Sequence, residues 1–298
     1  MNTATHLNTN AQAALALSDD ERIHKIRTPR WIGYPRAKMM LEQLEDCLSQ
    51  PKTHRMSNLL IVGSTNNGKS KIIARFNDKH PAYDNPDGEG ITIPVLSIQS
   101  PPVLDENRFY NEILGALFAA FKPDDHASRK QMQVIGLLKR LNVKMLIIDD
   151  FQHLLASTMD KQRTFLNVIK YFGNELQIPI VAVGVKDAFR AIQTDPQLSN
   201  RFEPAILPKW QMDQEYLRLL ASFEAMLPLK EPSGLTETTM AAKLLSISEG
   251  TIGDLSKLLN KAAIHAIKSK SERITIKVLS SINWIPPSEH KRQVDKVS

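Results

Sequence analysis

Eight residues, GSTNNGKS at 63–70, place the strongest constraint on what this chain can fold into. They follow the apolar run NLLIV and precede KIIARF, so the pattern G-x-x-x-x-G-K-[ST] stands where a buried strand gives way to a helix. In that context the backbone N–H groups of the loop form a cradle for phosphates, and the helix N-terminus adds positive potential. The loop therefore predicts an α/β domain that binds ATP.

The individual residues of this loop have expected roles. Lys69 is expected to reach the β- and γ-phosphates, and Ser70 to bind Mg²⁺, so ATP and Mg²⁺ are the predicted cofactors. The other nucleotide-binding candidates line the loop or open the helix: Gly63, Ser64, Thr65, Asn66, Asn67, Gly68 and Lys71.

A second apolar run, MLII at 145–148, ends in two aspartates. Ligands of open α/β sheets bind at the carboxyl ends of the strands. Asp149 is therefore expected to hold Mg²⁺ together with Ser70, and Asp150 to orient the attacking water. An acidic strand end is also commonly just a solvated turn, and only the phosphate loop favours the catalytic interpretation.

The remaining pattern predicts a doubly wound parallel sheet followed by helices. Apolar runs predict strands at 58–63, 91–99, 143–150 and 178–184, alternating with helical segments. After about residue 210 the strand signal stops, and helices are expected at 213–227, 235–248, 251–269 and 275–282. We expect a flexible N-terminal arm at 1–20, a nucleotide-binding α/β domain at 21–210, a small all-helical lid at 211–285 and a tail at 286–298.

Composition excludes several other classes of protein. The single cysteine, Cys47, excludes an intramolecular disulfide and a cysteine-built zinc site. The histidines show no paired metal-ligand spacing, and no apolar run is long enough to cross a bilayer. We therefore expect a cytoplasmic protein with no membrane partner and no metal other than Mg²⁺.

The basic residues are clustered. The net charge is +6, and residues 22–38 carry six Lys or Arg and no Asp or Glu, with aromatic residues between them. A second basic run covers 257–277. Such runs suit a phosphate backbone, although each is equally typical of a solvated helix face. The candidate DNA-binding residues are Arg108, Arg129, Lys130, Lys257 and Lys261.

Four stretches taken together resemble a known family. They are RWIGYPRAKMMLEQLEDCL, NLLIVGSTNNGKSKIIARF, VKMLIIDDFQHLL and IPIVAVGVKDAFRAIQTDPQLSNRFEP. Their order is similar to that of AAA+ ATPases of the initiator and helicase-loader clade, and within it to the TniB/TnsC group of DNA-transposition regulators. The resemblance covers about residues 22–285 and implies a P-loop AAA+ core followed by a helical lid.

The resemblance also implies a function. In the TniB/TnsC group, ATP bound between subunits assembles rings or filaments on duplex DNA of any sequence, and the assembly recruits a transposase. Arg201 matches the arginine finger that reaches the γ-phosphate of a neighbouring subunit. Trp31, Ile32 and Tyr34 match the segment beside the adenine, although packing is an equally good explanation of the aromatic residues. A homo-oligomer associated with a bacterial nucleoid is therefore expected.

Three departures from the family pattern point to slow, switch-like hydrolysis. Asp150 replaces the usual glutamate, Gly184 and Val185 offer no polar side chain after the fourth strand, and Gly253 and Asp254 stand where a basic residue is expected. Two other functions stay open: an ATPase that loads a helicase or initiates replication, and a small-molecule P-loop kinase. The kinase is disfavoured because the helical domain follows the sheet and is rich in lysine.

Overall fold

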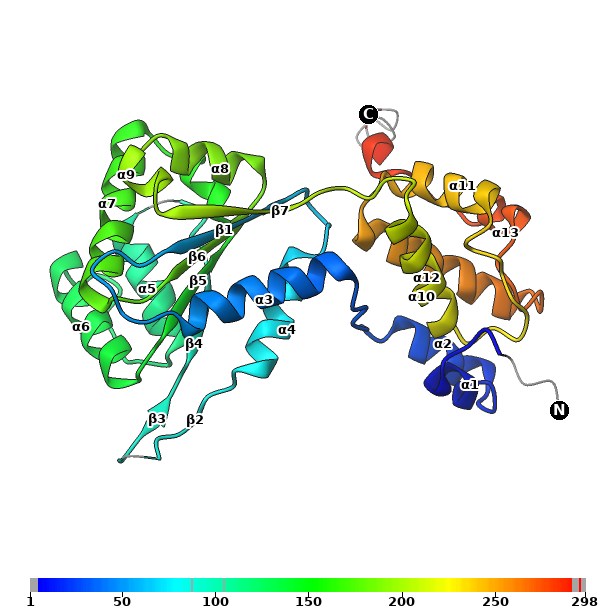
Figure 1. Ribbon diagram of the computed structural model, residues 1–298, viewed down its shortest axis with the longest axis horizontal. Helices are drawn as coiled ribbons and strands as arrows, with labels where there is room; N and C mark the ends of the chain where they lie inside the picture. Colours follow the sequence, from blue (N-terminus) through cyan, green and yellow to red (C-terminus); the bar gives the residue numbers. More distant parts are fainter. Residues whose placement is uncertain (1–4, 87, 104, 291–294, 296–298) are drawn as a thin grey trace. The chain divides into compact units, whose positions relative to one another are not determined.

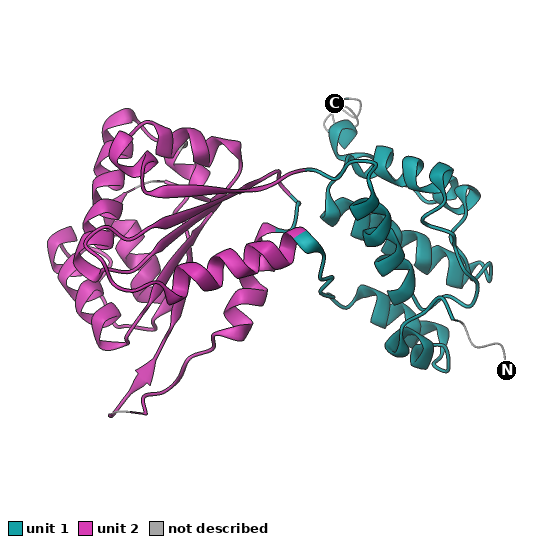
Figure 2. Cartoon of the chain, in the orientation of Figure 1, with its two compact units in different colours: residues 1–35, 66–68, 209–298 teal, residues 36–65, 69–208 magenta. Residues whose placement is uncertain are grey.

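The computed structural model describes residues 5–86, 88–103, 105–290 and 295. The chain forms two compact units (Figure 2). The helical unit comprises Met1–Pro35, Asn66–Gly68 and Lys209–Ser298, and the α/β unit comprises Arg36–Thr65 and Lys69–Pro208. Among the described residues, no helix is both long enough and apolar enough to span a bilayer.

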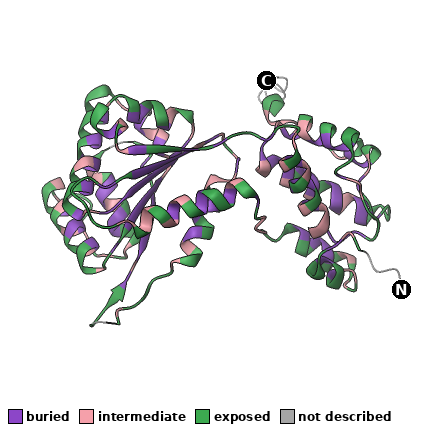
Figure 3. Ribbon diagram, in the orientation of Figure 1, coloured by how far each residue is buried: buried purple, intermediate pink, exposed green. Residues whose placement is uncertain are grey.

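The α/β unit is built on a five-stranded parallel sheet with the order β4-β5-β6-β1-β7 (Figure 1). The three central strands are almost wholly buried (Figure 3), as expected for a parallel sheet covered on both faces. The strands are β1 (Asn58–Gly63), β4 (Val95–Gln99), β5 (Met145–Asp149), β6 (Ile180–Gly184) and β7 (Phe202–Leu207).

Helices lie on both sides of this sheet, with α3 and α4 on one side and α5, α6 and α7 on the other (Figure 1). On the second side Phe109 packs edge-on against Phe165 and Phe172 within the main hydrophobic core. The helices are α3 (Pro35–Ser49), α4 (Lys69–Lys79), α5 (Glu106–Ala116), α6 (Ala127–Arg140), α7 (Met159–Leu176), α8 (Lys186–Gln193) and α9 (Pro196–Ser199), with a 3₁₀ helix, η1, at Phe151–Ala156.

The predicted doubly wound α/β fold is confirmed, with two differences in its strands. The expected strand at 91–99 is divided at Pro94, so that β3 (Ile91–Thr92) forms a small hairpin with β2 (Tyr83–Asp84) while β4 joins the main sheet. Strand β7 was not expected at all. Within the described residues it pairs only with β1, and an edge strand of this kind tolerates Pro204 because one side needs no backbone donor.

The helical unit contains the four helices expected after residue 210, each shorter than its predicted range. They are α10 (Gln214–Met226), α11 (Thr238–Ser248), α12 (Ile252–Lys268) and α13 (Ile276–Ser281), followed by a short 3₁₀ helix, η2, at Pro287–Glu289. Helix α12 is amphipathic and buries one face, which includes Leu255, Leu258 and Leu259. Of the predicted tail at 286–298, residues 291–294 and 296–298 lie outside the described residues.

The expected flexible arm at 1–20 is wrong for residues 5–20. These residues form α1 (Thr9–Ala14) and lead into α2 (Asp19–Arg27), which begins with a capping box between Ser18 and Glu21. Leu7, Ala11 and Ala14 are buried, and the Asn8 N–H donates to the carbonyl of Ala225 at 2.8 Å. Residues 21–35 accordingly belong to the helical unit and not to the α/β domain in which they were expected.

Candidate functional site

The loop between β1 and α4 has the backbone shape that a phosphate cradle needs. Gly68 has a φ of +91° and Asn66 a φ of +61°, both in the left-handed region that glycine and asparagine accept most readily. Gly63 is also required at its position, because a Cβ there would lie 2.9 Å from the Leu207 carbonyl oxygen of the neighbouring strand. The turn therefore depends on the glycines at both ends of the motif.

Lys69 lies at the first position of α4 and is held by its own loop. Its Nζ donates to the carbonyl oxygens of Gly63 and Ser64 at 2.8 and 2.9 Å. Partial burial lowers the pKa of Lys69, and the negative charges of Asp149 and Asp150 oppose that shift. The ammonium group is therefore fixed inside the loop, where an anionic ligand would strengthen its charged form.

Ser70 and Asp149 come together as the sequence predicts. The Ser70 Oγ donates to the Asp149 Oδ2 at 2.9 Å, and the Asp150 N–H donates to the Asp149 Oδ1 at 2.8 Å. One hydroxyl and one carboxylate beside a phosphate loop form the sparse set of oxygen ligands that Mg²⁺ uses when phosphates and water complete its shell. The side chains present thus fit a magnesium ion. No group of three His, Cys, Asp or Glu side chains suited to another metal occurs in the described part of the chain.

Asp150 follows β5 with a left-handed backbone, φ +55°, and begins η1. Its Oδ1 accepts a hydrogen bond of 2.9 Å from Nε2 of Gln152, whose Oε1 accepts one of 3.3 Å from the Val185 N–H. Gln152 did not appear among the expected site residues, because a single glutamine after an acidic strand end carries no recognisable pattern.

The tip of the loop, Asn66–Gly68, makes its contacts within the helical unit. The Asn66 Nδ2 donates to the Asp254 Oδ1 at 2.7 Å, and the Gly253 N–H donates to the Asn66 carbonyl at 2.9 Å. A Cβ on Gly253 would lie 2.2 Å from the Asn66 Oδ1. The two residues that stand where a basic side chain was expected therefore contact the loop tip directly.

The three residues expected beside the adenine occupy different surroundings. Tyr34 is buried edge-on against Trp210 at 5.1 Å between ring centroids, and its hydroxyl lies near Gly68. Trp31 lines a different cavity, of about 450 Å³, with Lys25 and Met226. Ile32 is half-buried. Tyr34 is thus the residue of the three whose side chain lies at the loop tip.

Arg201 lies at the opposite end of the sheet from the phosphate loop. It immediately precedes β7, and its carbonyl accepts from the N–H of Asn58, the first residue of β1, at 2.8 Å. Because β1 and β7 are parallel and in register from Asn58 to Gly63, Arg201 and Gly63 flank opposite ends of this strand pair. The Arg201 Nη1 donates to Asn174 at 2.9 Å, and a cavity of about 310 Å³ beside it is lined by Arg55, Met56, Ser57, Gln197 and Asn200.

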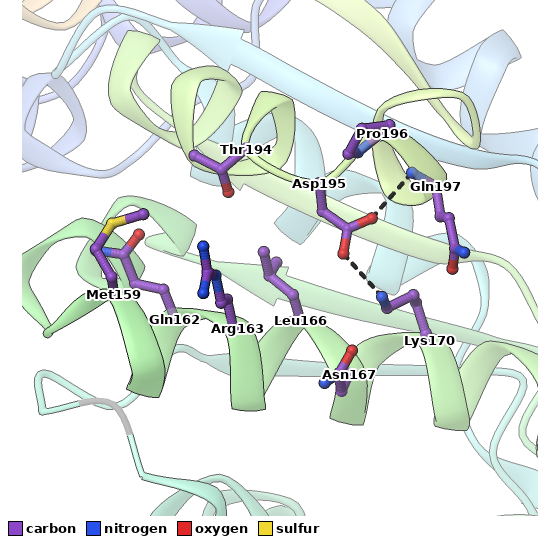
Figure 4. Close-up of a pocket in the computed structure, with 10 residues that line it drawn as sticks. All are labelled: Met159, Gln162, Arg163, Leu166, Asn167, Lys170, Thr194, Asp195, Pro196 and Gln197. Carbon is purple, nitrogen blue, oxygen red and sulfur yellow. Dashed lines mark hydrogen bonds and ion pairs between the residues drawn. The ribbon is translucent and has the colours of Figure 1, made fainter.

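A larger cavity, of about 500 Å³, lies along α7, between that helix and the segment from Thr194 to Gln197 (Figure 4). Lys170 and Asp195 form an ion pair at 2.8 Å across it, and the Gln197 N–H donates to Asp195 at 2.9 Å. Gln197 also lines the Arg201 cavity. The two cavities therefore share Gln197 as a lining residue.

Four of the five predicted DNA-binding residues are exposed, and one is buried. Arg108 is exposed, Arg129 is 73% exposed beside Asp125, and Lys257 is 65% exposed. Lys261 is exposed and lies over the Trp284 ring at 5.5 Å. The prediction for Lys130 is wrong, because that residue is 1% exposed and its ammonium donates to the Pro123 carbonyl.

In the basic run at 22–38, Lys25, Arg27 and Lys38 are exposed, whereas two arginines make structural contacts. Arg22 is buried against Glu272, and Arg30 donates to the Met226 carbonyl at 2.8 Å and to Asn260 at 2.9 Å. These two guanidinium groups therefore hold the helical unit together and do not form a free basic face.

Comparison with known families gives a clear result. The family described as Bacterial TniB protein matches residues 22–212. This chain belongs to the TniB family. No curated protein sequence matches it.

Solved structures show the same fold at low identity. The ORC2 protein of Aeropyrum pernix, solved as ADPNP–ADP complexes, has a TM-score of 0.57 at 15% identity over 86% of this chain and 70% of that one. Cdc6p of Pyrobaculum aerophilum has a TM-score of 0.57 at 16% identity over 86% and 68%. The ORC1 protein of Aeropyrum pernix in complex with DNA has a TM-score of 0.54 at 14% identity over 92% and 71%. The TniB chain therefore has the same AAA+ fold as these ORC and Cdc6 proteins.

Proposed function

We propose that this TniB-family chain is an ATPase that assembles on duplex DNA in its ATP-bound state and recruits a transposase. The observation that carries the proposal is the contact of Ser70 with Asp149 beside the fixed ammonium of Lys69. Ser70 and Asp149 would hold Mg²⁺, which when bound supplies positive charge to the phosphates. Lys69 would bind the β- and γ-phosphates, and Asp150 would orient the attacking water.

The position of Arg201 supports assembly. Strand β1 has six residues, so at ~3.3 Å per residue the two ends of the β1–β7 pair are roughly 20 Å apart. An arginine at the amino end of the sheet is too far from the phosphate loop at the carboxyl end to contact a nucleotide held there. As an arginine finger, Arg201 would therefore act on the nucleotide of a neighbouring subunit, and the cavities beside it would lie at that interface.

Two features support DNA binding: the exposed basic residues, and the repetition of these residues in an assembly of many subunits. One subunit offers few basic contacts, so its DNA affinity should be weak and sensitive to salt. ATP-dependent assembly would place many copies of Arg108, Arg129, Lys257 and Lys261 along one duplex, and linked sites gain avidity without new contacts. Binding should thus be cooperative and independent of sequence, while the aspartate at position 150 favours slow turnover.

The experiment is a mobility-shift series on random-sequence duplex DNA with ATP, with ADP and without nucleotide, at increasing salt. The expected result is tight, salt-sensitive binding with ATP alone. Equal DNA binding in all three nucleotide states would show that ATP does not control DNA binding, and this would contradict the proposal. DNA-stimulated ATP turnover without a phosphorylated small molecule would exclude the kinase.

A replication or helicase loader would have the same fold and would give the same results in these assays. A direct test is whether the ATP-bound protein on DNA retains a transposase encoded beside it. Retention in the presence of ATP, and its loss with Lys69→Ala, is the result expected for a transposition regulator.

A further inference from the structure

Gln152 links the ends of two neighbouring strands in the α/β unit. Strands β5 and β6 are parallel neighbours, with Ile148 paired to Ala182, so the residues that follow them meet at one edge of the sheet. From η1, the Gln152 Nε2 reaches Asp150 after β5 at 2.9 Å, and its Oε1 accepts from the N–H of Val185 after β6 at 3.3 Å.

Gly184 provides the space for this side chain. A Cβ at position 184 would lie 2.6 Å from the Gln152 Oε1 and 2.7 Å from the Ala188 Cβ. Any larger residue at the end of β6 would therefore push the amide away. Residues 184–185 have no polar side chain, and the Gln152 amide from η1 provides a polar group at this position.

The chemistry at this position requires a side chain with both a donor and an acceptor. The Asp150 carboxylate needs a donor, and the Val185 N–H, which lies at the start of α8, needs an acceptor. Helix α8 has no side-chain cap hydrogen bond of its own at Val185. Reversing the amide would place oxygen against carboxylate and N–H against N–H, so the two partners fix its orientation.

We propose that Gln152 is a positioning residue that holds the Asp150 carboxylate in place for ATP hydrolysis. This proposal rests on the function proposed above, in which Asp150 orients the attacking water. Asp150 stands on a left-handed turn with a side chain one methylene shorter than glutamate, so its direction depends on an external support. Gln152 provides that support and ties it to the start of α8.

The test compares Gln152→Glu with Gln152→Met in the full chain. Glutamate keeps the size and the acceptor for Val185 but places a second negative charge against Asp150. Methionine keeps the length and removes both hydrogen bonds. Both variants should lower kcat about 10- to 100-fold, the usual effect of misplacing a catalytic group, while KM for ATP stays near the parental value because Lys69 and Ser70 are untouched.

The split between kcat and KM separates positioning from a structural role. Loss of structure would weaken ATP binding and lower the folded fraction together with kcat, whereas a misplaced Asp150 carboxylate lowers kcat alone. Parental kcat in both Gln152 variants would overturn the proposal.

A mutant cycle with Asp150→Asn gives a second test. If Gln152 acts through the Asp150 carboxylate, Gln152→Met should cause no further loss of turnover once Asp150→Asn is present. If the double variant instead loses turnover by the product of the two single-variant losses, the two residues act independently and the proposal is contradicted. The control is Gly136→Ala on α6, where no atom lies within 4 Å of a new Cβ, and turnover should not change.

Nucleotide binding distinguishes this proposal from the function on which it rests. Calorimetric titration with ATP should give parental affinity for both Gln152 variants, which also shows that they are folded. If Lys69→Ala leaves ATP binding unchanged, the proposed function itself fails. If Lys69→Ala abolishes binding while both Gln152 variants keep parental turnover, only the role of Gln152 fails.

Discussion

The ion pair between Arg22 and Glu272 makes a specific prediction about the stability of the helical unit. Arg22 is 1% exposed, and its Nη1 and Nη2 donate to the two carboxylate oxygens of Glu272 at 2.9 and 2.5 Å. Its Nε and Nη2 also donate to the Pro228 carbonyl at 3.1 and 2.6 Å. One buried guanidinium thus joins α2 to two segments more than 200 positions away in the sequence.

The informative change is Glu272→Gln, which keeps the size of the side chain and removes its charge. The guanidinium then remains buried, with one oxygen acceptor replaced by an N–H₂ group that cannot accept. Removing one partner of a buried pair costs about 3–5 kcal/mol. Asp19, 38% exposed and 3.3 Å from Arg22, keeps part of the counter-charge, so we expect a loss of about 3 kcal/mol.

Urea unfolding followed by tryptophan fluorescence measures this loss in the correct unit, because Trp31, Trp210 and Trp284 all belong to the helical unit. The matched control is Glu231→Gln. Glu231 lies in the same helical unit, and its side chain is exposed. An exposed carboxylate contributes about 0–1 kcal/mol, so the control should change little.

Two results would refute this reasoning. One is a loss below about 1 kcal/mol for Glu272→Gln, which would mean that Arg22 is readily solvated. The other is an equal loss for the two Glu→Gln variants. The double variant Arg22→Met with Glu272→Met should recover stability relative to Glu272→Gln, because no unpaired charge is left buried.

Four further outcomes are expected. Burial alone would raise the pKa of Glu272, but hydrogen bonds and charge from Arg22 lower it overall. Its contribution to stability should therefore be present above about pH 4.3 and lost as the pH falls through the lowered pKa, and Glu272→Gln should flatten that part of an acid-unfolding profile. Lys69→Ala should abolish ATP binding in a calorimetric titration. Arg201→Ala should keep ATP binding and lower turnover, and mixing it with Lys69→Ala should restore part of the activity. Burial and the nearby Glu203 raise the pKa of Cys47 to about 11, so iodoacetamide at pH 8 should label the native protein at least about tenfold more slowly than the urea-unfolded protein.

The parts of this fold that could be predicted from sequence are those fixed by local signals. The runs NLLIVG, MLII and IPIVAVG are continuously apolar because their strands are buried on both faces, and each forms a central strand. The four helices after residue 210 each bury one amphipathic face, which gives a 3.6-residue period. The phosphate loop is equally local, since strand, glycines and helix are contiguous.

The missed elements depend on contacts distant in sequence. Residues 5–20 look like a polar arm in the sequence, but contacts such as that of Asn8 with Ala225 and the burial of Leu7 show that they are folded. Arg22 belongs to a basic run that suits a phosphate backbone, but in the structure it is paired with Glu272. The hydrogen bond from Val185 to Gln152 requires β5 and β6 to be neighbours, although a helix separates them along the chain.

Strand β7 is the omission with the largest consequence for function. It is a short edge strand with a proline and with exposed residues at three of its six positions, so it lacks the continuous apolar run of the others. Once β7 is placed parallel to β1, the position of Arg201 follows without further information. A residue that precedes a parallel strand lies at the amino edge of the sheet, whereas a phosphate loop that follows one lies at the carboxyl edge. Topology therefore places Arg201 at the end of the β1–β7 pair opposite Gly63, which is what its proposed role on a neighbouring subunit requires.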